Sequence, residues 1–163
     1  MIRTEHHEGI SGQLTMTVCA RSGEVLARQV APNLITLAGK RLLARLLTGG
    51  IDGRIELSMV VGAGSRAPAV TDTALEEPVE EVPAQLDQIE DVGKAVRIRV
   101  RATLPQRDQK KVLQLREAGI LVRALSSSGR EGKPWPLLFN RVTFDVLSRN
   151  NRTSIMLAWD ITL

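Results

Sequence analysis

The stretch Val96-Arg-Ile-Arg-Val-Arg-Ala-Thr-Leu104 alternates apolar and polar residues over its whole length. Successive side chains of a β-strand point to opposite faces of the sheet, so this period of two predicts a strand with one face turned to a core. Arg97, Arg99 and Arg101 then share the other face, with neighbouring side chains about 7 Å apart. Pro105 closes the strand because proline cannot donate to a ladder.

The same alternation recurs along the chain on both sides of this stretch. It predicts strands over residues 13–20, 25–30, 55–61, 96–104, 113–124, 142–146 and 155–163. Between the first two, Gly23 supplies the positive φ of a hairpin turn, and Pro32 is expected to end the second. In residues 113–124 the apolar positions change from odd to even numbers, which predicts a β-bulge or kink between Arg116 and Gly119.

One helix is predicted between the second and third of these strands. Asn33 or Thr36 can cap it, and Gly49-Gly50 is a typical stop. The apolar residues at helical spacing form a stripe that we expect to pack on the sheet: Ile35, Ala38, Gly39, Leu42, Leu43, Leu46 and Leu47.

The segment of about residues 62–93 combines Pro68, Pro78 and Pro83 with acidic residues, and it shows no clear alternation. We interpret it as a long acidic excursion with at most a short helical turn at residues 73–77. Few large apolar residues are available to hold it, so we expect it to be mobile in an isolated subunit and to become ordered on assembly.

The element order predicts a mainly β protein, an antiparallel β-sandwich with one early α-helix packed against it (α+β). A parallel α/β fold is disfavoured because too few crossover helices are present. We expect residues 1–12 to form a flexible arm and residues 13–163 to form a single domain.

Composition narrows the class of protein further. The chain has 163 residues, of which 43% are apolar, and one cysteine, Cys19, so no intrachain disulfide is possible. The sequence has no apolar run long enough to span a bilayer and no secretory leader, which predicts a soluble protein folded in a reducing cytoplasm. Aromatic residues make up only 2%, which argues against a surface that stacks bases or sugars.

No residue is predicted to be catalytic, cofactor-binding or metal-binding. The run Gly62-Ala-Gly-Ser-Arg-Ala67 follows a strand as a dinucleotide motif would, but Pro68 comes next and no helix follows, so we interpret it as a turn. His6 and His7 are adjacent and lack further ligands at familiar spacing. Since the chain has no other histidine, a Ser-His or Cys-His relay is also disfavoured.

Charge is segregated along the chain, although the net charge is only +4. The charged residues among positions 72–91 are all acidic, and those among positions 94–111 are mostly basic. We predict that these blocks meet between subunits of a homo-oligomer, with contacts among Arg97, Arg99, Arg101, Glu76, Glu77, Glu80 and Glu81. Two alternatives stay open: a solvated outer face, and internal pairing in which the acidic segment folds over its own arginines. Nucleic acid is disfavoured as a partner because aromatic residues are not interleaved with the bases.

Several segments read together resemble small virion proteins of tailed phages and prophages, of the tail-fibre and baseplate type. The resemblance covers about residues 33–163 and rests on these segments: Asn33-Leu-Ile-Thr-Leu-Ala-Gly-Lys-Arg-Leu-Leu-Ala-Arg-Leu-Leu47, Val61-Gly-Ala-Gly-Ser-Arg-Ala-Pro68 with Thr71-Asp-Thr-Ala-Leu75 (a "VGxGxxAP…DTxL" pattern), Glu117-Ala-Gly-Ile120, Leu138-Phe-Asn-Arg-Val142 and Leu157-Ala-Trp-Asp-Ile-Thr162.

The resemblance implies a non-enzymatic structural subunit that is assembled in the host cytoplasm and resides in the virion or a phage-tail-like particle. Its expected partners are other copies of itself and other virion proteins, with no cofactor and no membrane. Fibre proteins of this type usually continue into a shaft or receptor-binding tip, which these residues lack, so we do not expect receptor recognition. A capsid decoration subunit and a soluble carbohydrate- or partner-binding β-sandwich are the alternatives.

Overall fold

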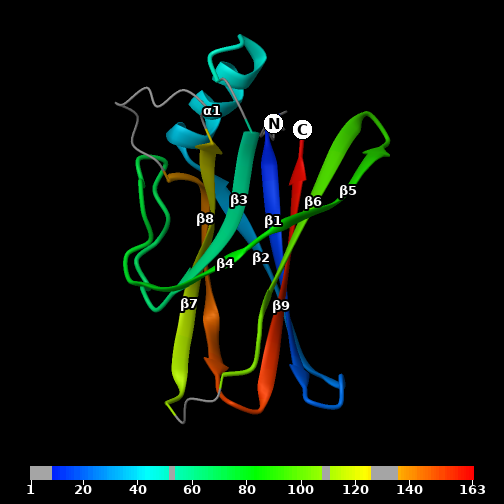
Figure 1. Ribbon diagram of the computed structural model, residues 1–163, viewed down its shortest axis with the longest axis vertical. Helices are drawn as coiled ribbons and strands as arrows, with labels where there is room; N and C mark the ends of the chain where they lie inside the picture. The colour runs from blue at the N-terminus through cyan, green and yellow to red at the C-terminus, as the bar shows by residue number, and fades with distance from the viewer. Residues whose placement is uncertain (1–8, 52–53, 108–110, 126–135) are drawn as a thin grey trace, which may run out of the picture.

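The computed structural model describes residues 9–51, 54–107, 111–125 and 136–163, and nine strands and one helix lie in these residues (Figure 1). The elements are β1 (Ser11–Ala20), β2 (Val25–Ile35), α1 (Leu37–Leu47), β3 (Arg54–Gly62), β4 (Pro78–Pro83), β5 (Gln85–Val92), β6 (Ala95–Leu104), β7 (Leu113–Leu125), β8 (Leu137–Arg149) and β9 (Thr153–Thr162). No helix among the described residues is both long and apolar enough to cross a membrane.

The strands form one antiparallel sheet in the order β4-β3-β7-β8-β2-β1-β9-β6-β5. The predicted class, mainly β with antiparallel strands and one early helix, is therefore confirmed. The arrangement is one curled sheet, however, and a sandwich of two separate sheets is not confirmed. β1 and β9 lie side by side with Ser11 opposite Thr162, so one begins and the other ends at the end of the sheet where α1 lies (Figure 1).

Two features of the chain curl the sheet. β2 pairs with β1 from Val25 to Asn33 and then with β8 at Leu34 and Ile35, so one strand belongs to both halves. On the opposite side, the edge strands β4 and β5 are joined by a single residue, Ala84, whose amide donates to the Leu57 carbonyl at 3.0 Å. The two edges of the sheet are therefore held together at this residue.

The core lies between the two halves of the curled sheet. The alternation of Val96 to Leu104 behaves as predicted, because Val100, Ala102 and Leu104 are buried. On β9, Trp159 is completely buried, and aliphatic side chains of β1 such as Leu14 and Met16 pack in the same cluster. Because so few aromatic residues are present, aliphatic packing supplies almost all of this core.

The helix begins after the second of the two predicted caps. Thr36 is the N-cap and accepts a hydrogen bond from the Gly39 amide at 2.9 Å, whereas Asn33, the other candidate, lies in β2. β2 continues through Pro32 to Ile35, so the prediction that Pro32 ends this strand is wrong. Only part of the apolar stripe is core, because Leu42 is buried while Leu47 is 89% exposed.

The prediction of a long loop at residues 62–93 is also wrong in part. Its second half forms β4 and β5, and the expected helical turn at residues 73–77 is not present. β5 forms a hairpin with β6 across Gly93, which has a φ of +64°. The signal was available in Gly93-Lys94, which is typical of a two-residue hairpin turn.

The predicted irregularity in residues 113–124 is confirmed. The register of β7 against β8 shifts between Leu115 and Glu117, and again between Ile120 and Leu121. Leu115 is buried before the first shift, and Ala118 is buried after it. Between the pairs Leu115–Leu147 and Glu117–Thr143, the single β7 residue Arg116 lies opposite residues 144–146 of β8. The extra residues are therefore on β8, and β7 changes its buried positions beside this bulge.

Candidate functional site

The arginines predicted for a subunit interface lie on β6, and each has an acidic partner within the chain. Arg99 donates two hydrogen bonds to the Asp160 carboxylate on β9, at 2.7 and 2.9 Å. This pairing, with the nearby charges of Glu90 and Asp87, raises the pKa of Arg99 above its usual value despite partial desolvation. Arg99 is thus fixed to its own sheet.

The two flanking arginines pair with the acidic edge strand β5. Arg97 lies 3.2 Å from Glu90, and Arg101 lies 3.0 Å from Asp87. The three arginines are therefore paired within the chain, as the alternative of internal pairing expects. The acids that pair with Arg97 and Arg101 come from the end of the acidic block. A contact between subunits at these arginines stays a prediction.

The four acids predicted to meet these arginines lie elsewhere. Glu76 and Glu77 precede β4, and Glu80 and Glu81 are on β4, at the other edge of the sheet from β5. Glu80 forms ion pairs with the buried Arg149 and, at 3.9 Å, with Arg107. The structure therefore does not bring these acids to the Arg97-Arg99-Arg101 face of the same chain.

A buried charge cluster that the sequence analysis missed holds the segment before β4. Arg141 on β8 is fully buried and donates to Glu117 on β7 at 2.8 and 3.0 Å and to Asp72 at 2.7 Å. It also donates to the main-chain carbonyl of Arg66 at 2.9 Å. Burial opposes ionisation of Asp72. The Ala69 amide and the side chains of Arg141 and Arg66 nevertheless donate hydrogen bonds to its carboxylate, and its pKa is lowered.

Glu117 connects this cluster to the backbone of the same segment. It is fully buried, and its carboxylate accepts hydrogen bonds from the amides of Gly64, Glu76 and Glu77 at 3.1, 3.1 and 2.7 Å. A Cβ atom at Gly62 or Gly64 would lie 2.6 Å from Glu117 Oε1, so only glycine fits at both positions. The run from Gly62 to Ala67 is thus a turn around a carboxylate.

The segments that carry the phage resemblance meet at this cluster. Gly62, Gly64 and Asp72 come from residues 61–75, Glu117 comes from residues 117–120 and Arg141 comes from residues 138–142. The helix segment joins from the side, because the Thr36 hydroxyl donates to the Leu138 carbonyl at 2.6 Å and the Leu37 amide donates to Val70 at 2.8 Å. Their nearness in space could not be seen from the sequence alone.

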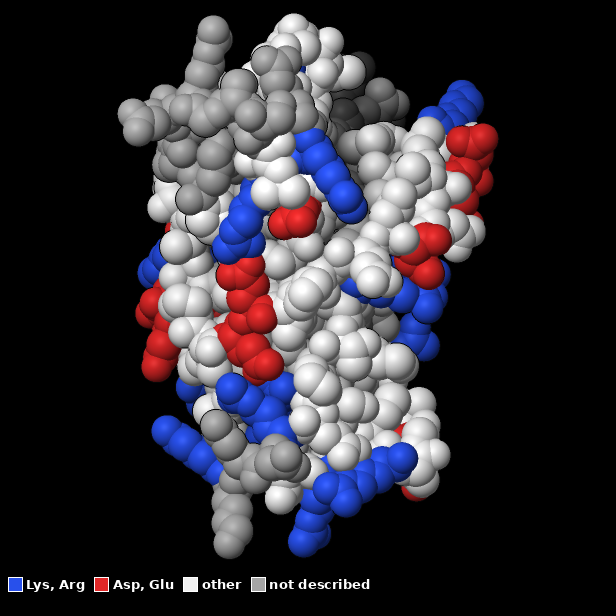
Figure 2. All heavy atoms as spheres, viewed as in Figure 1, with Lys and Arg blue, Asp and Glu red and all other residues white. Residues whose placement is uncertain are grey.

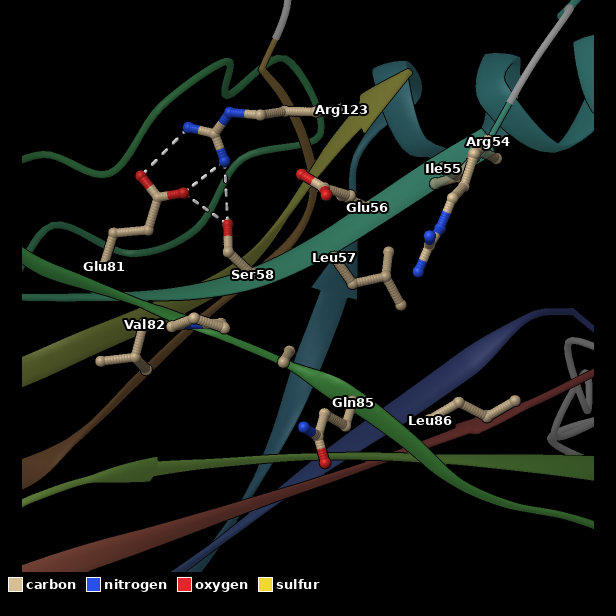
Figure 3. Close-up of a pocket in the computed structure, with 12 residues that line it drawn as sticks. Arg54, Ile55, Glu56, Leu57, Ser58, Glu81, Val82, Gln85, Leu86 and Arg123 are labelled. Atoms are coloured by element: carbon tan, nitrogen blue, oxygen red, sulfur yellow. Dashed lines mark hydrogen bonds and ion pairs between the residues drawn. The ribbon is translucent and has the colours of Figure 1, made fainter. Parts of the chain in front are cut away.

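A surface cleft of about 820 Å³ lies where β4 passes into β5 (Figure 3). β3 forms one wall with residues 54–58, and residues 81–86 form the other. β3 pairs with β4 only from Ser58 onward, so no described strand pairs with the cleft side of β3 from Arg54 to Leu57. The cleft is therefore the place where the curled sheet stays open.

One end of the cleft carries a polar network. The Ser58 hydroxyl donates to Glu81 at 2.5 Å, and Arg123 donates to both Ser58 and Glu81. Hydrogen bonds from Arg123 and Ser58 outweigh partial desolvation and lower the pKa of Glu81. Ion pairing with Glu81 raises the pKa of Arg123. Because these groups satisfy each other, the network closes this end of the cleft rather than offering a reactive group.

Figure 2 shows the charges on the face that contains the cleft. Acidic side chains lie in a column at its middle, basic side chains lie at both ends of this column and are most numerous at the lower end of the molecule, and the surface on one side of the column is largely uncharged. The described parts of the chain contain no group of three or more His, Cys, Asp or Glu residues that could hold a metal ion. Cys19 is a buried strand residue.

Comparisons with known proteins add no further constraint, because no family model, no curated protein and no solved structure matches this chain.

Proposed function

We propose that the chain is a non-enzymatic structural subunit of a tailed phage or phage-tail-like particle, a tail, baseplate or fibre-adaptor component that assembles in several copies. Its partners are other copies of itself and other virion proteins, and its location is the assembled particle.

The observation that supports this proposal is that residues of the segments that carry the resemblance hold the fold together. Glu117, Arg141 and Asp72 are all buried and hydrogen-bonded to one another or to main-chain groups. In an enzyme, a motif of this kind would present a reactive group to a pocket. Here each motif residue holds a neighbouring segment in place, which supports a scaffold role.

The basic lower end of the molecule supports assembly in several copies. A basic end and an acidic column on one molecule favour contacts between unlike surfaces, and such head-to-tail contacts generate rings or arrays. A capsid decoration subunit would use the same features, so the location on the particle has to be measured.

The test is to find the protein in particles. Antibodies raised against the purified chain are used on gradient-purified particles from the source strain after prophage induction, by immunoblot and by immunogold electron microscopy. We expect a constant ratio to the major particle proteins and gold labels at the tail. Labels on the head would select the decoration alternative, and absence from the particle fraction would refute the proposal.

A further inference from the structure

A second pocket, lined by apolar residues, lies between α1 and the curled sheet and opens to the surface beside Leu46 and Leu163. Its volume is about 280 Å³, and apolar residues alone line it: Leu42, Leu43, Leu46, Ile55, Leu57, Ile98, Val100, Ile120, Val122, Phe139, Ile161 and Leu163. Protein interiors are normally packed with few voids larger than a water molecule. An apolar cavity of about 150 Å³ is already large enough to stay dry and bind benzene. This cavity therefore has room for an aliphatic group on the order of ten carbon atoms.

The cavity adjoins the surface cleft. Ile55 and Leu57 of β3 line both spaces, so the two are separated by the same pair of side chains. The open side of β3 lies at this point, because β4 leaves β3 at Ala84. A flexible chain entering through the cleft would thus pass from a partly polar surface into a pocket lined by apolar residues.

Among the described residues that line the cleft, one cation has no acidic partner. Arg54 lines the cleft, and its side chain makes no hydrogen bond or ion pair with any residue that the structure describes. Figure 3 shows it extending from β3 over the cleft on the side of Leu57, while Glu56 is directed toward Arg123. Arg123 is already paired with Glu81. Of the two arginines that line the cleft, Arg54 is therefore the one without a partner among the described residues.

We propose that the cleft and the cavity form one binding site for an amphipathic anion, a medium-length aliphatic chain with a carboxylate head. The chain occupies the cavity beneath α1, and the carboxylate pairs with Arg54 at the entrance. An arginine can bind a carboxylate through two parallel hydrogen bonds, which fixes the head group while burial of the chain supplies most of the affinity. This site is independent of the proposed role in a particle.

The test is isothermal titration of the purified full chain with sodium decanoate below its micelle concentration. We expect saturable binding of one decanoate per chain. Ile98→Trp, which fills the cavity from β6, should weaken binding at least tenfold, and Leu46→Trp, which fills it from α1, should do the same. Val25→Trp adds the same side chain at an exposed site and should leave binding unchanged. Circular dichroism checks that each variant is folded.

The head group is tested separately. Arg54→Glu should weaken decanoate binding about tenfold or more, whereas Arg28→Glu, on the exposed part of β2, should have no effect. Decanol, which has the same chain without a charge, should bind to the wild type more weakly than decanoate does. Its affinity should be the same for Arg54→Glu as for the wild type. Absence of saturable decanoate binding, or equal binding by both cavity-filling variants and the wild type, would overturn the site. Equal binding by Arg54→Glu would overturn the role of Arg54.

Discussion

At the scale of single residues, Arg141 has the largest predicted effect on stability. Replacing it with methionine keeps much of the side-chain volume but leaves Glu117 and Asp72 without their buried cation. Breaking a buried ion pair from one side typically costs about 3–5 kcal/mol, so Arg141→Met should lower the free energy of unfolding by about that amount. Urea denaturation measures it. Arg28→Met, at an exposed position, is the control, and an equal effect of both substitutions would contradict the assignment.

The lowered pKa of Asp72 predicts how the free energy of unfolding changes with pH. Because its pKa is lowered in the folded protein, its contribution is present above the unfolded value of about 3.9 and is lost as the pH falls through the folded value. Asp72→Asn should therefore be less stable than the wild type at pH 7, and the difference should shrink below about pH 4. Denaturation curves between pH 7 and pH 2 measure this, with Asp145→Asn as the control exchange. A difference that is constant over this range would contradict it.

At the scale of elements, the start of α1 is joined to β8 by one hydroxyl group. Thr36 is fully buried, accepts from the Gly39 amide and donates to the Leu138 carbonyl. Thr36→Ala removes both bonds and should cost about 1–2 kcal/mol, a typical value for loss of an N-cap. Thr36→Ser keeps the hydroxyl and should cost clearly less. Thermal and urea unfolding compare the two, and equal losses would show that the methyl group matters more than the bonds.

The segment between β3 and β4 gives a second prediction at this scale. The sequence suggests that residues 62–93 are mobile in a free subunit, but the Gly64, Glu76 and Glu77 amides bond to the buried Glu117 carboxylate. We therefore expect these amides to exchange slowly with solvent in the isolated protein. Glu117→Gln should accelerate their exchange while leaving β1 and β9 protected. Fast exchange throughout this segment in the wild type would restore the expectation of mobility.

At the scale of the whole molecule, the prediction concerns assembly. We expect an oligomer whose mass falls as salt is added, because exposed charge pairs select partners and are screened by ions. The triple variant Arg97→Glu, Arg99→Glu and Arg101→Glu should be smaller than the wild type in sedimentation or light scattering. A wild type that is monomeric at all concentrations would contradict this, as would an oligomer unaffected by salt and by the variant.

A matched control separates the two uses of these arginines. In the wild type, Asp87 and Glu90 pair with Arg101 and Arg97 within the chain. Asp87→Asn with Glu90→Gln frees these arginines without altering them. If the arginines also contact a neighbouring subunit, this double variant should assemble at least as well as the wild type. Loss of the oligomer in both variants would mean that intrachain pairing, rather than an intersubunit contact, maintains the assembly surface.

Local pattern was sufficient for much of the fold. The alternation of Val96 to Leu104, the helix cap at Thr36, the turn at Gly23 and the change of buried positions in β7 near Arg116 were all predictable, because each depends on residues close together in the chain. Side-chain period and turn chemistry act over a few residues, so the sequence alone determined that this is a mainly β protein with one helix.

Only the tertiary structure decided what depends on distant residues. β5 looked like a loop because its acids suggest solvent, yet Arg97 and Arg101 of β6 neutralise two of them in a strand pair. The sequence analysis did not single out Glu117 and Arg141 as a buried pair, because a charged residue carries no sequence sign of its distant partner. The apolar cavity beneath α1 likewise depends on how the sheet curls and where its edges stay open. Burial and charge pairing depend on which residues lie close together in space, and local sequence patterns do not show which distant residues these are.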